Sequence, residues 1–532
     1  MSAMLAAGIM VAGAEPATAD DLTADDFKDA SPPVSATKTK PGGGAVIAQL
    51  AGNPAKENKP LVSMGGQPHV FIWSSAIPGH WSDVSKWTNN LATGTAPSPA
   101  GRQDYVLNFT QPGKYDVVND LQDGLVLNQL NSSATDMKVE GWSITFAANG
   151  ATATQPHIQQ VAPGSITIIA PVKLEANLIV EVMRNGDVTL DGQVSGTGGL
   201  VKNGDGQLRV THTKNTYTGG TIINHGSLCM FVANDGLGPG PITLNAGGSL
   251  DLERVSGFNP LILNGGTIHA GNGFGDRWNG PIMLNGNTKI TSTADFVLGG
   301  GMNGPGGFTH IGGIGGCGPT NSGTVTLAGS NNYDGPTIVR RGTLRVLKAS
   351  SLYHADPARW TPAHITVHPS ATLALNVGGP DELTGAHVGT LLHNLTSSVR
   401  DNGLMERAVV CLDTANAKTP VVIPNDLSDS KGPGGGAFLL RKCGAGTLQL
   451  SGTNSYTGPT TVSAGTLALA TVRSLGSNTE VTLSSEATLA LNFNGEMHIG
   501  KLTIDGKSQP AGTYSAANTP KSIKGTGALK TQ

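Results

Sequence analysis

The side chains that could perform acid–base chemistry on a sugar gather in one part of the sequence. Asp251 and Glu253 form an acidic pair, and Asp276 and Arg277 follow in the next short segment. Paired carboxylates, often beside a basic group, are what glycoside hydrolases and polysaccharide lyases use. These four residues are therefore the candidate catalytic residues. The alternative, which we favour, is that they are outward-facing surface charges without a catalytic role.

Two other patterns resemble ligand-binding motifs but lack the elements that such motifs need. The run 313–318 fits GxGxxG, but a nucleotide-binding loop must open a helix, and here Pro319 and a strand-like segment follow. His364 and His368 have the spacing of a helical metal motif. The segment between them has strand character, in which four residues span ~13 Å. We therefore predict neither a metal site nor a cofactor.

The cysteines and the charge balance exclude further classes of protein. Cys229, Cys317, Cys411 and Cys443 are scattered and form no CxxC pair, so a zinc site is not expected. The four cysteines are expected to be small buried residues, and one or two disulfides are expected if the protein is exported. The sequence does not say which cysteines would pair. The net charge is -3 and no basic stripe is present, which argues against nucleic-acid binding by phosphate neutralisation.

Three segments of the chain are variations on one phrase, and this repetition predicts how the residues above are positioned. Each phrase reads Asn-x-Tyr-x-Gly and runs on to Gly-Thr-Leu or Gly-Ser-Leu. The repeated positions are Asn215, Tyr217, Gly219 and Gly226 in the first copy, Asn331, Tyr333, Gly335 and Gly342 in the second, and Asn454, Tyr456, Gly458 and Gly465 in the third. Self-similarity on this scale is typical of stacked repeat architectures.

Short strands separated by glycine-rich turns follow each phrase. The segments 242–252, 365–375 and 481–491 share an Ile/Val-Thr-x opening and a Leu-x-Leu ending, and the middle copy carries an insertion around Tyr353–Trp360. Such strands are too short to be stable alone, but stacking coil on coil completes their hydrogen bonds. The 75 glycines suit turns that need positive φ. We predict an all-β protein, a right-handed parallel β-helix, without a helix beyond the leader.

The repeated Asn and Tyr have two interpretations. Both residue types bind sugars, but a stacked Asn also joins one turn to the next, and a stacked Tyr packs over the neighbouring coil. We favour the structural interpretation. The cluster of Trp73, Trp81 and Trp87 is likewise expected to cap the open first coil rather than to stack on a glycan.

The composition along the chain predicts the domain organisation. Residues 1–19 are an apolar leader typical of a signal peptide, although the usual basic start is missing, and residues 20–68 are a linker. Residues 69–150 form the N-terminal cap and first coils. Residues 151–532 form the β-helix, with repeat copies near 196–252, 304–375 and 442–491 and a C-terminal cap at 500–532. No other segment has the length and hydropathy of a membrane span.

The phrases from Gly198 to Leu228 and from Lys442 to Leu467 resemble the autotransporter-associated β-strand repeat, also called the passenger-associated transport repeat. The resemblance implies export, a parallel β-helix and a surface or extracellular role, and it brings no catalytic residues. Full-length autotransporters end in an outer-membrane β-barrel. Only coil-like segments follow Thr460, so the resemblance implies release, or attachment by another factor.

These observations predict an exported structural or adhesin-like β-solenoid that presents an extended surface and performs no catalysis. The expected location is secreted or at a bacterial cell surface, and the expected partner is a surface glycan or a second copy of the chain. A carbohydrate-active β-helix enzyme is the alternative function.

Overall fold

The computed structural model describes residues 67–90, 95–150, 153–231, 236–271, 275–313, 323–398 and 400–532. The predicted leader, nearly all of the predicted linker, Cys317 and most of the GxGxxG run lie outside these residues. Residues Ser63–Gln532 form one compact unit.

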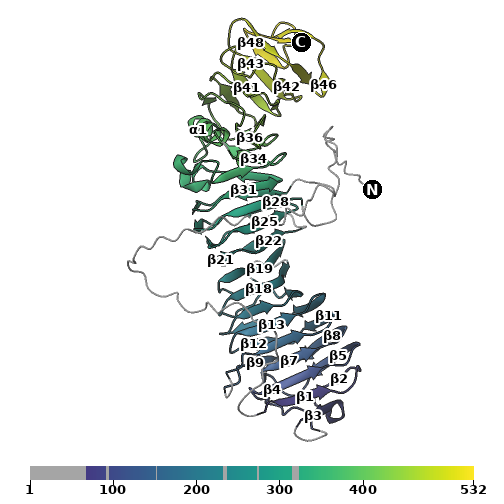
Figure 1. The fold of residues 1–532 in the computed structure, drawn as a ribbon. Helices are drawn as coiled ribbons and strands as arrows, with labels where there is room; N and C mark the ends of the chain where they lie inside the picture. Colours follow the sequence, from purple (N-terminus) through teal and green to yellow (C-terminus); the bar gives the residue numbers. More distant parts are fainter. Residues whose placement is uncertain are drawn as a thin grey trace, which may run out of the picture. The chain divides into compact units, whose positions relative to one another are not determined.

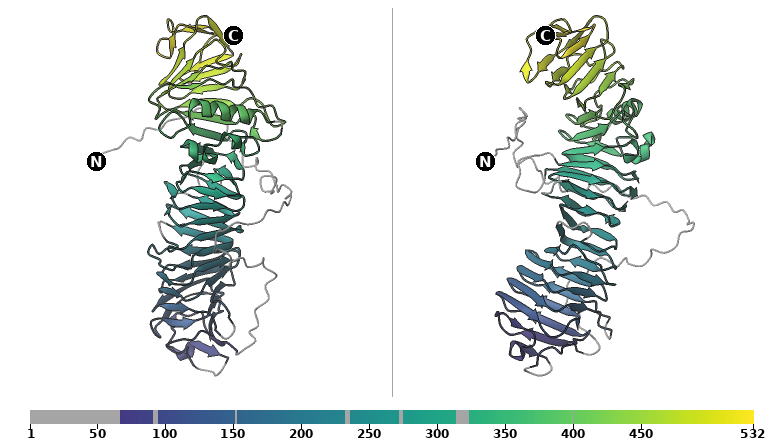
Figure 2. Two further views of the ribbon diagram at one scale, coloured as in Figure 1. Left: turned by 90° about the vertical axis from the view of Figure 1, so that its left-hand side faces the viewer. Right: turned by 180° about the vertical axis from the view of Figure 1, so that it is seen from behind.

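The described chain winds in coils, and most strands pair in parallel with a strand of the coil before and of the coil after (Figures 1 and 2). Side chains alternate along each strand. In β13 (Leu178–Val182), Leu178, Val180 and Val182 are buried, whereas Ile179 and Glu181 are half-exposed. The strands of successive coils pair in register, so that inward residues lie above inward residues; Leu178, for example, pairs with Leu200 of the next coil. The inward aliphatic side chains therefore form one continuous core, which confirms the predicted parallel β-helix.

The strands fall into three columns, one for each side of a coil. The first column contains β4 (Tyr105–Phe109), β7 (Gln129–Ser132), β10 (His157–Gln160), β13, β16 (Leu200–Asn203), the first halves of β18 (Thr221–Phe231) and β19 (Ile242–Glu253), β21 (Leu261–Asn264), β24 (Ile282–Leu284), β27 (Met302–Gly304) and β30 (Asn332–Tyr333). The second column contains β5 (Lys114–Asn119), β8 (Asp136–Gly141), β11 (Gly164–Ile168), β14 (Gly186–Leu190), β17 (Gln207–Val210), the second halves of β18 and β19, β22 (Thr267–Ala270), β25 (Thr288–Ser292), β28 (Phe308–Gly312), β31 (Thr337–Arg341), β33 (Ile365–Val367) and β35 (Gly403–Leu404).

The third column begins with β6 (Leu125–Leu127), β9 (Ile144–Phe146), β12 (Val172–Leu174) and β15 (Val194–Gly196). It continues with β20 (Ser256–Gly257), β23 (Asp276–Trp278), β26 (Asp295–Leu298), β29 (Thr324–Leu327), β32 (Thr343–Val346), β34 (Thr372–Asn376), β36 (Val409–Asp413), β38 (Leu439–Cys443), β40 (Thr460–Val462), β42 (Glu480–Leu483) and β45 (Lys501–Ile504). The later coils add β37 (Val421–Ile423), β39 (Thr447–Leu450), β41 (Gly465–Leu469), β43 (Ala487–Leu491) and β48 (Ile523–Gly525), and then β44 (Glu496–Ile499), β46 (Lys507–Ser508), β47 (Gly512–Ser515) and β49 (Ala528–Thr531).

An aromatic cluster closes the first coil. Its elements are β1 (His69–Trp73), β2 (Gly79–His80), η3 (Val84–Lys86) and β3 (Trp87–Asn89). Trp73 and Trp87 pack edge to face with their centroids 4.9 Å apart, and Trp87 Nε1 donates to the Trp81 carbonyl at 2.9 Å. All three indole rings are buried, so none of them presents a face to a ligand in this structure.

The middle of the chain carries two insertions, one of which the sequence did not predict. Three 3-10 turns, η4 (Ala349–Ser351), η5 (Tyr353–Ala355) and η6 (Pro357–Arg359), fill the predicted insertion. The expectation that no helix would occur is wrong, because the chain forms α1 (Gly385–Thr396; Figure 1). The helix packs against β35 and β37. Thr384 caps its first turn, and its buried face is largely aliphatic. On this side the preceding coil has the 3-10 turns and the next coil has β37, and the apolar face of the helix packs against both.

The three repeat copies do not lie on the same side of the coils. The strand that opens each copy is β16, β28 or β38, and these belong to the first, second and third columns respectively. In each copy this strand pairs with the strand that follows the repeated Tyr, as Leu200 does with Thr221, Phe308 with Thr337, and Leu440 with Thr460. Each copy is therefore displaced by one side of the coil relative to the copy before it.

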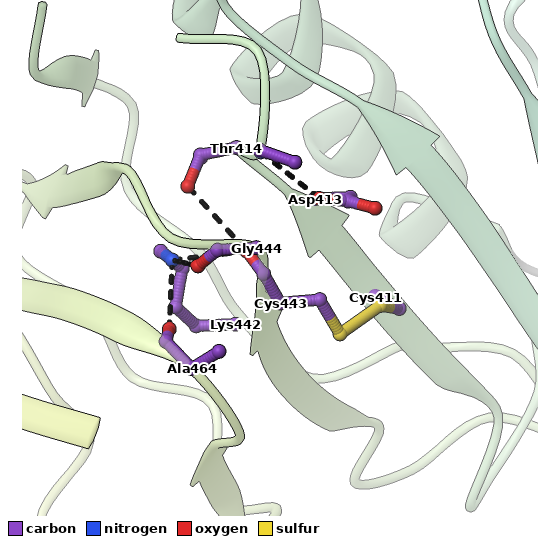
Figure 3. The surroundings of a disulfide bond; sticks show 8 residues. Cys411, Asp413, Thr414, Lys442, Cys443, Gly444 and Ala464 are labelled. Atoms are coloured by element: carbon purple, nitrogen blue, oxygen red, sulfur yellow. Dashed lines mark hydrogen bonds between the residues drawn. A yellow bond between two sulfur atoms is a disulfide. The ribbon is translucent and has the colours of Figure 1, made fainter. Parts of the chain in front are cut away.

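A disulfide joins Cys411 of β36 to Cys443 of β38, its partner strand in the third column (Figure 3). Cys229 is a free thiol and is buried. Burial, and then the negative charges of Glu253 and Asp251, raise the pKa of this thiol to about 11. The Cys229 thiol is consequently un-ionised at neutral pH and a poor nucleophile.

Candidate functional site

The four candidate catalytic residues lie on two sides of the coil and point in different directions. Asp251 and Glu253 lie on the outward side of the second column, in β19. Asp276 and Arg277 are consecutive in β23 of the third column, with Asp276 fully buried and Arg277 exposed. Consecutive strand residues face opposite sides of a sheet. The structure therefore brings Asp251 and Glu253 to one surface and separates Asp276 from Arg277.

The carboxylate of Asp276 holds a turn of the preceding coil. Asp276 Oδ1 accepts a hydrogen bond from the Val255 amide at 2.8 Å, next to Arg254, whose φ is 59°. Burial raises the pKa of Asp276, while the amides of Val255 and Arg254 oppose that rise. An inward carboxylate that binds backbone amides acts as a turn cap.

The surroundings of Asp251 are half-buried and mixed in charge. Its strand neighbours in register are Cys229 and His269. Ser249 Oγ donates to Asp251 Oδ1 at 2.5 Å, and His269 Nδ1 lies 2.6 Å from Thr291 Oγ1. Burial raises the pKa of Asp251, and the hydrogen bond from Ser249 and then the nearby His269 partly offset the rise. These side chains line one outward row of the sheet.

The repeated Asn joins three successive coils through its side chain. Asn215 Oδ1 accepts from the Val194 amide of the preceding coil at 2.7 Å, and Asn215 Nδ2 donates to the Gly236 carbonyl of the next coil at 2.7 Å. Equivalent bonds join Asn331 to Met302 N (3.0 Å) and Ser351 O (2.8 Å), and Asn454 to Leu427 N (2.8 Å) and Ser474 O (2.6 Å). All three amides are buried, and each satisfies backbone groups above and below its own coil.

The repeated Tyr has the same geometry in every copy. Each ring is fully buried and its hydroxyl pairs with the Thr four residues later. The three pairs are Tyr217–Thr221 (2.7 Å), Tyr333–Thr337 (2.5 Å) and Tyr456–Thr460 (2.7 Å). A buried hydroxyl requires such a partner, so the fourth residue after each Tyr is part of the same structural unit.

The repeated glycines stand where a side chain would meet the neighbouring coil. Gly226, Gly342 and Gly465 have φ values of 66°, 79° and 67°. A Cβ on Gly465 would lie 2.5 Å from the carbonyl oxygens of Gly444 and Gly446. Gly219, Gly335 and Gly458 are confined in the same way, by backbone atoms of the preceding coil within 2.5 Å of a Cβ.

A buried cation accompanies two of the copies, and the sequence alone did not reveal its role. The Lys442 ammonium donates to the carbonyls of Cys443, Gly444 and Ala464 at 2.9, 2.8 and 3.0 Å (Figure 3). Lys202 makes the same three contacts in the first copy, at 2.7–3.1 Å. Burial lowers the pKa of both amines to about 8. All three donors of each ammonium are used, so the lysine closes the turn of its own coil onto the next.

In the middle copy His310 takes the position of this lysine. Its ring nitrogens lie 3.2 Å from the carbonyl oxygens of Ile290 and Gly323. Burial lowers the pKa of His310 to about 4. The ring is therefore neutral at pH 7 and carries one N–H for the two carbonyls.

An outward row of asparagines, which was not predicted from the sequence, runs along the first column. Its members, here called the amide ladder, are Asn203, Asn224, Asn245, Asn264 and Asn285. From Asn224 onward, each Nδ2 donates to the Oδ1 of the preceding rung, at 2.8, 2.6, 2.8 and 2.9 Å in order. The signal available in the sequence was an Asn at the end of one strand in each of five successive coils.

A second row lies beside the amide ladder on the same outward side, two residues earlier in each strand. We call it the apolar row; its members are Ile179, Val201, Ile222, Ile262 and Met283, with Thr243 between Ile222 and Ile262. These side chains are half-exposed, and Met283 is 43% exposed. Aliphatic side chains thus reach the surface where an antiparallel sheet would usually show polar ones.

The described residues contain neither a metal-ligand cluster nor a helix suited to span a membrane. No group of three His, Cys, Asp or Glu side chains in that part of the chain is placed to hold a metal ion. His364 and His368 flank the strand β33 at its two ends. No helix within the described ranges is long and apolar enough to span a membrane.

Comparison with known proteins relates the chain to one repeat family. The family model described as passenger-associated-transport-repeat matches residues 200–228, 320–346 and 440–469. The adhesin BmaC autotransporter of Brucella suis biovar 1 (strain 1330) is 30% identical over 408 residues, which is 76% of this chain and 10% of that protein. The chain thus spans about a tenth of the relative's length. No solved structure matches.

The matched segments contain the repeated Tyr–Thr pairs of all three copies, the two buried lysines and the turn glycines described above. The chain therefore contains three passenger-associated-transport repeats, which are wound into a parallel β-helix.

Proposed function

We propose that this chain is an exported, surface-displayed, adhesin-like β-helix that presents an extended contact surface and performs no catalysis. The similarity that covers 76% of the chain, to a protein described as an autotransporter adhesin, carries this proposal. The fold supports it physically. The coils use their aliphatic, amide and lysine side chains inside, and the outward sides of the columns are long, regular and available for contact.

The proposal is tested by displaying the chain on bacterial cells through a heterologous surface carrier. Cells that display the chain should adhere to a biological surface, such as epithelial cells or extracellular matrix, more strongly than cells that display the carrier alone. Protease treatment of intact cells should remove both the chain and the adherence. Equal adherence with and without the chain would contradict the proposal.

The alternative function, a carbohydrate-active enzyme, draws on Asp251, whose half-buried carboxyl has a raised pKa beside His269. Such an enzyme requires a second carboxyl group at the separation that glycoside hydrolases use. Asp276 is inside the coil and occupied by the Val255 amide. Glu253 is the remaining candidate for the second carboxyl group. The assay measures the release of reducing ends from polysaccharides. Activity of the wild type that is lost in both Asp251→Asn and Glu253→Gln would establish the enzymatic alternative.

A further inference from the structure

The amide ladder and the apolar row together form a regular surface that the fold itself does not require. The turns and the core are held by the buried Asn, Tyr and Lys residues, whereas the ladder is half-exposed or exposed. Successive rungs of stacked parallel strands are ~4.8 Å apart, so five rungs extend over ~19 Å. The two rows are separated by two residues of one strand, or ~7 Å.

The chemistry of the ladder is balanced between donors and acceptors. Each interior amide, Asn224, Asn245 and Asn264, spends one N–H and one oxygen lone pair on its neighbours. One N–H and one lone pair per amide are left for a ligand. Hydroxyl groups, which donate and accept, match such a surface. An anionic ligand would need donors alone, and a cationic ligand would need acceptors alone.

The charge and shape of this surface further restrict the class of ligand that it can bind. Between Val201 and Asn285 neither row carries a charged side chain. The nearest charge in register is Glu181, at the end of the ladder next to Asn203. The apolar row offers aliphatic contact to the C–H groups of a ligand that lies beside the amides. The surface therefore favours an uncharged, extended ligand with both hydroxyl and C–H faces.

We infer that the amide ladder and the apolar row bind a neutral, hydroxyl-rich polysaccharide chain that lies along the stacked coils. This inference rests on the proposed adhesin function and names its partner class. The hydroxyl groups exchange hydrogen bonds with the free halves of the amides, and the sugar C–H faces pack on Ile222, Ile262 and Met283.

The experiment is affinity electrophoresis of the purified full chain in native gels that contain one polysaccharide each. The neutral probes are dextran, mannan and hydroxyethyl cellulose, and the acidic probe is alginate. At least one neutral polysaccharide should retard the wild type, and alginate should not. The triple variant Asn224→Leu/Asn245→Leu/Asn264→Leu should bind that polysaccharide at least tenfold more weakly. Asn245→Asp, which keeps the surface polar but introduces charge, should also weaken binding.

The control is Gln207→Leu, which removes an outward amide from the second column and should leave binding unchanged. Thermal melts of each variant establish that the fold persists. Lack of retardation by all three neutral probes, equal retardation of the triple variant, or retardation by alginate overturns the inference. So does sedimentation showing a wild-type dimer that the triple variant abolishes, because the rows would then contact a second copy. Absence of polysaccharide binding would contradict the role of the amide ladder. Absence of adherence by cells that display the chain would contradict the proposed function.

Discussion

Replacing Asn454 with Ala should loosen the β-helix locally, at the turn of the preceding coil. The side chain of Asn454 accepts from the Leu427 amide at 2.8 Å and donates to the Ser474 carbonyl at 2.6 Å. A buried backbone group that loses its partner costs about 1–3 kcal/mol. Two such groups are left unpaired, so we expect a loss of about 2–6 kcal/mol in the free energy of unfolding of these coils.

Hydrogen exchange of individual amides is the most direct assay, because in a repeat architecture the loss falls on the coils in contact. The Leu427 amide should exchange faster by a factor of about 25 or more, since the expected loss is about 2 kcal/mol or more and about 1.4 kcal/mol corresponds to tenfold. Denaturant unfolding should show the same direction. The matched control is Asn264→Ala, which removes an exposed amide of the ladder and should change stability by less than about 0.5 kcal/mol.

The equivalent substitution Asn215→Ala should expose the Val194 amide in the same manner. Unchanged exchange of Leu427 in the Asn454→Ala variant, or an equal effect of Asn264→Ala, would refute the view that the repeated Asn is a bridge between coils.

Three further substitutions test other parts of the fold. Cys411→Ser should lower the free energy of unfolding by about 3–4 kcal/mol, the chain-entropy value for a closed loop of this length, and should make the melting temperature insensitive to dithiothreitol. Gly465→Ala should destabilise by about 2 kcal/mol or more, because its φ is 67° and carbonyl oxygens block the Cβ, whereas Gly506→Ala, with φ of 71° but open space, should cost less; equal losses in the two melts would contradict the role of the close contact. Because the pKa of His310 falls to about 4 on folding, the unfolded chain binds more protons between pH 6.5 and 4, so stability should fall on acidification through this range, by about 3 kcal/mol. Unfolding of His310→Gln should lose that pH dependence, and an unchanged profile would show that another group titrates.

Local requirements that recur in every coil could be predicted from the sequence. The Leu-x-Leu endings of the segments 242–252, 365–375 and 481–491 indicated short strands, and the repeated Tyr phrase indicated stacking. The family comparison matches the copies that the phrase had located. These features depend on a residue and its near neighbours, which a single sequence displays.

The insertions and the disulfide required the tertiary structure. The buried face of helix α1 packs against β35 and β37, and a single sequence does not show the surface on which it packs. Cys411 and Cys443 meet because strands β36 and β38 are partners. The spacing of the two cysteines in the sequence left their pairing open.

By itself, the sequence determined that this protein is a stack of short parallel strands joined by glycine turns, because these elements follow from local alternation and backbone freedom. Only the tertiary structure decided which side of the coil each residue occupies. The strand that opens each repeat copy lies one column further on than in the copy before it, so the three copies lie on three different sides. Parallel pairing within the first column brings five separate asparagines into one ladder. The assignment of β19 and β23 to different columns divides Asp251 from Asp276.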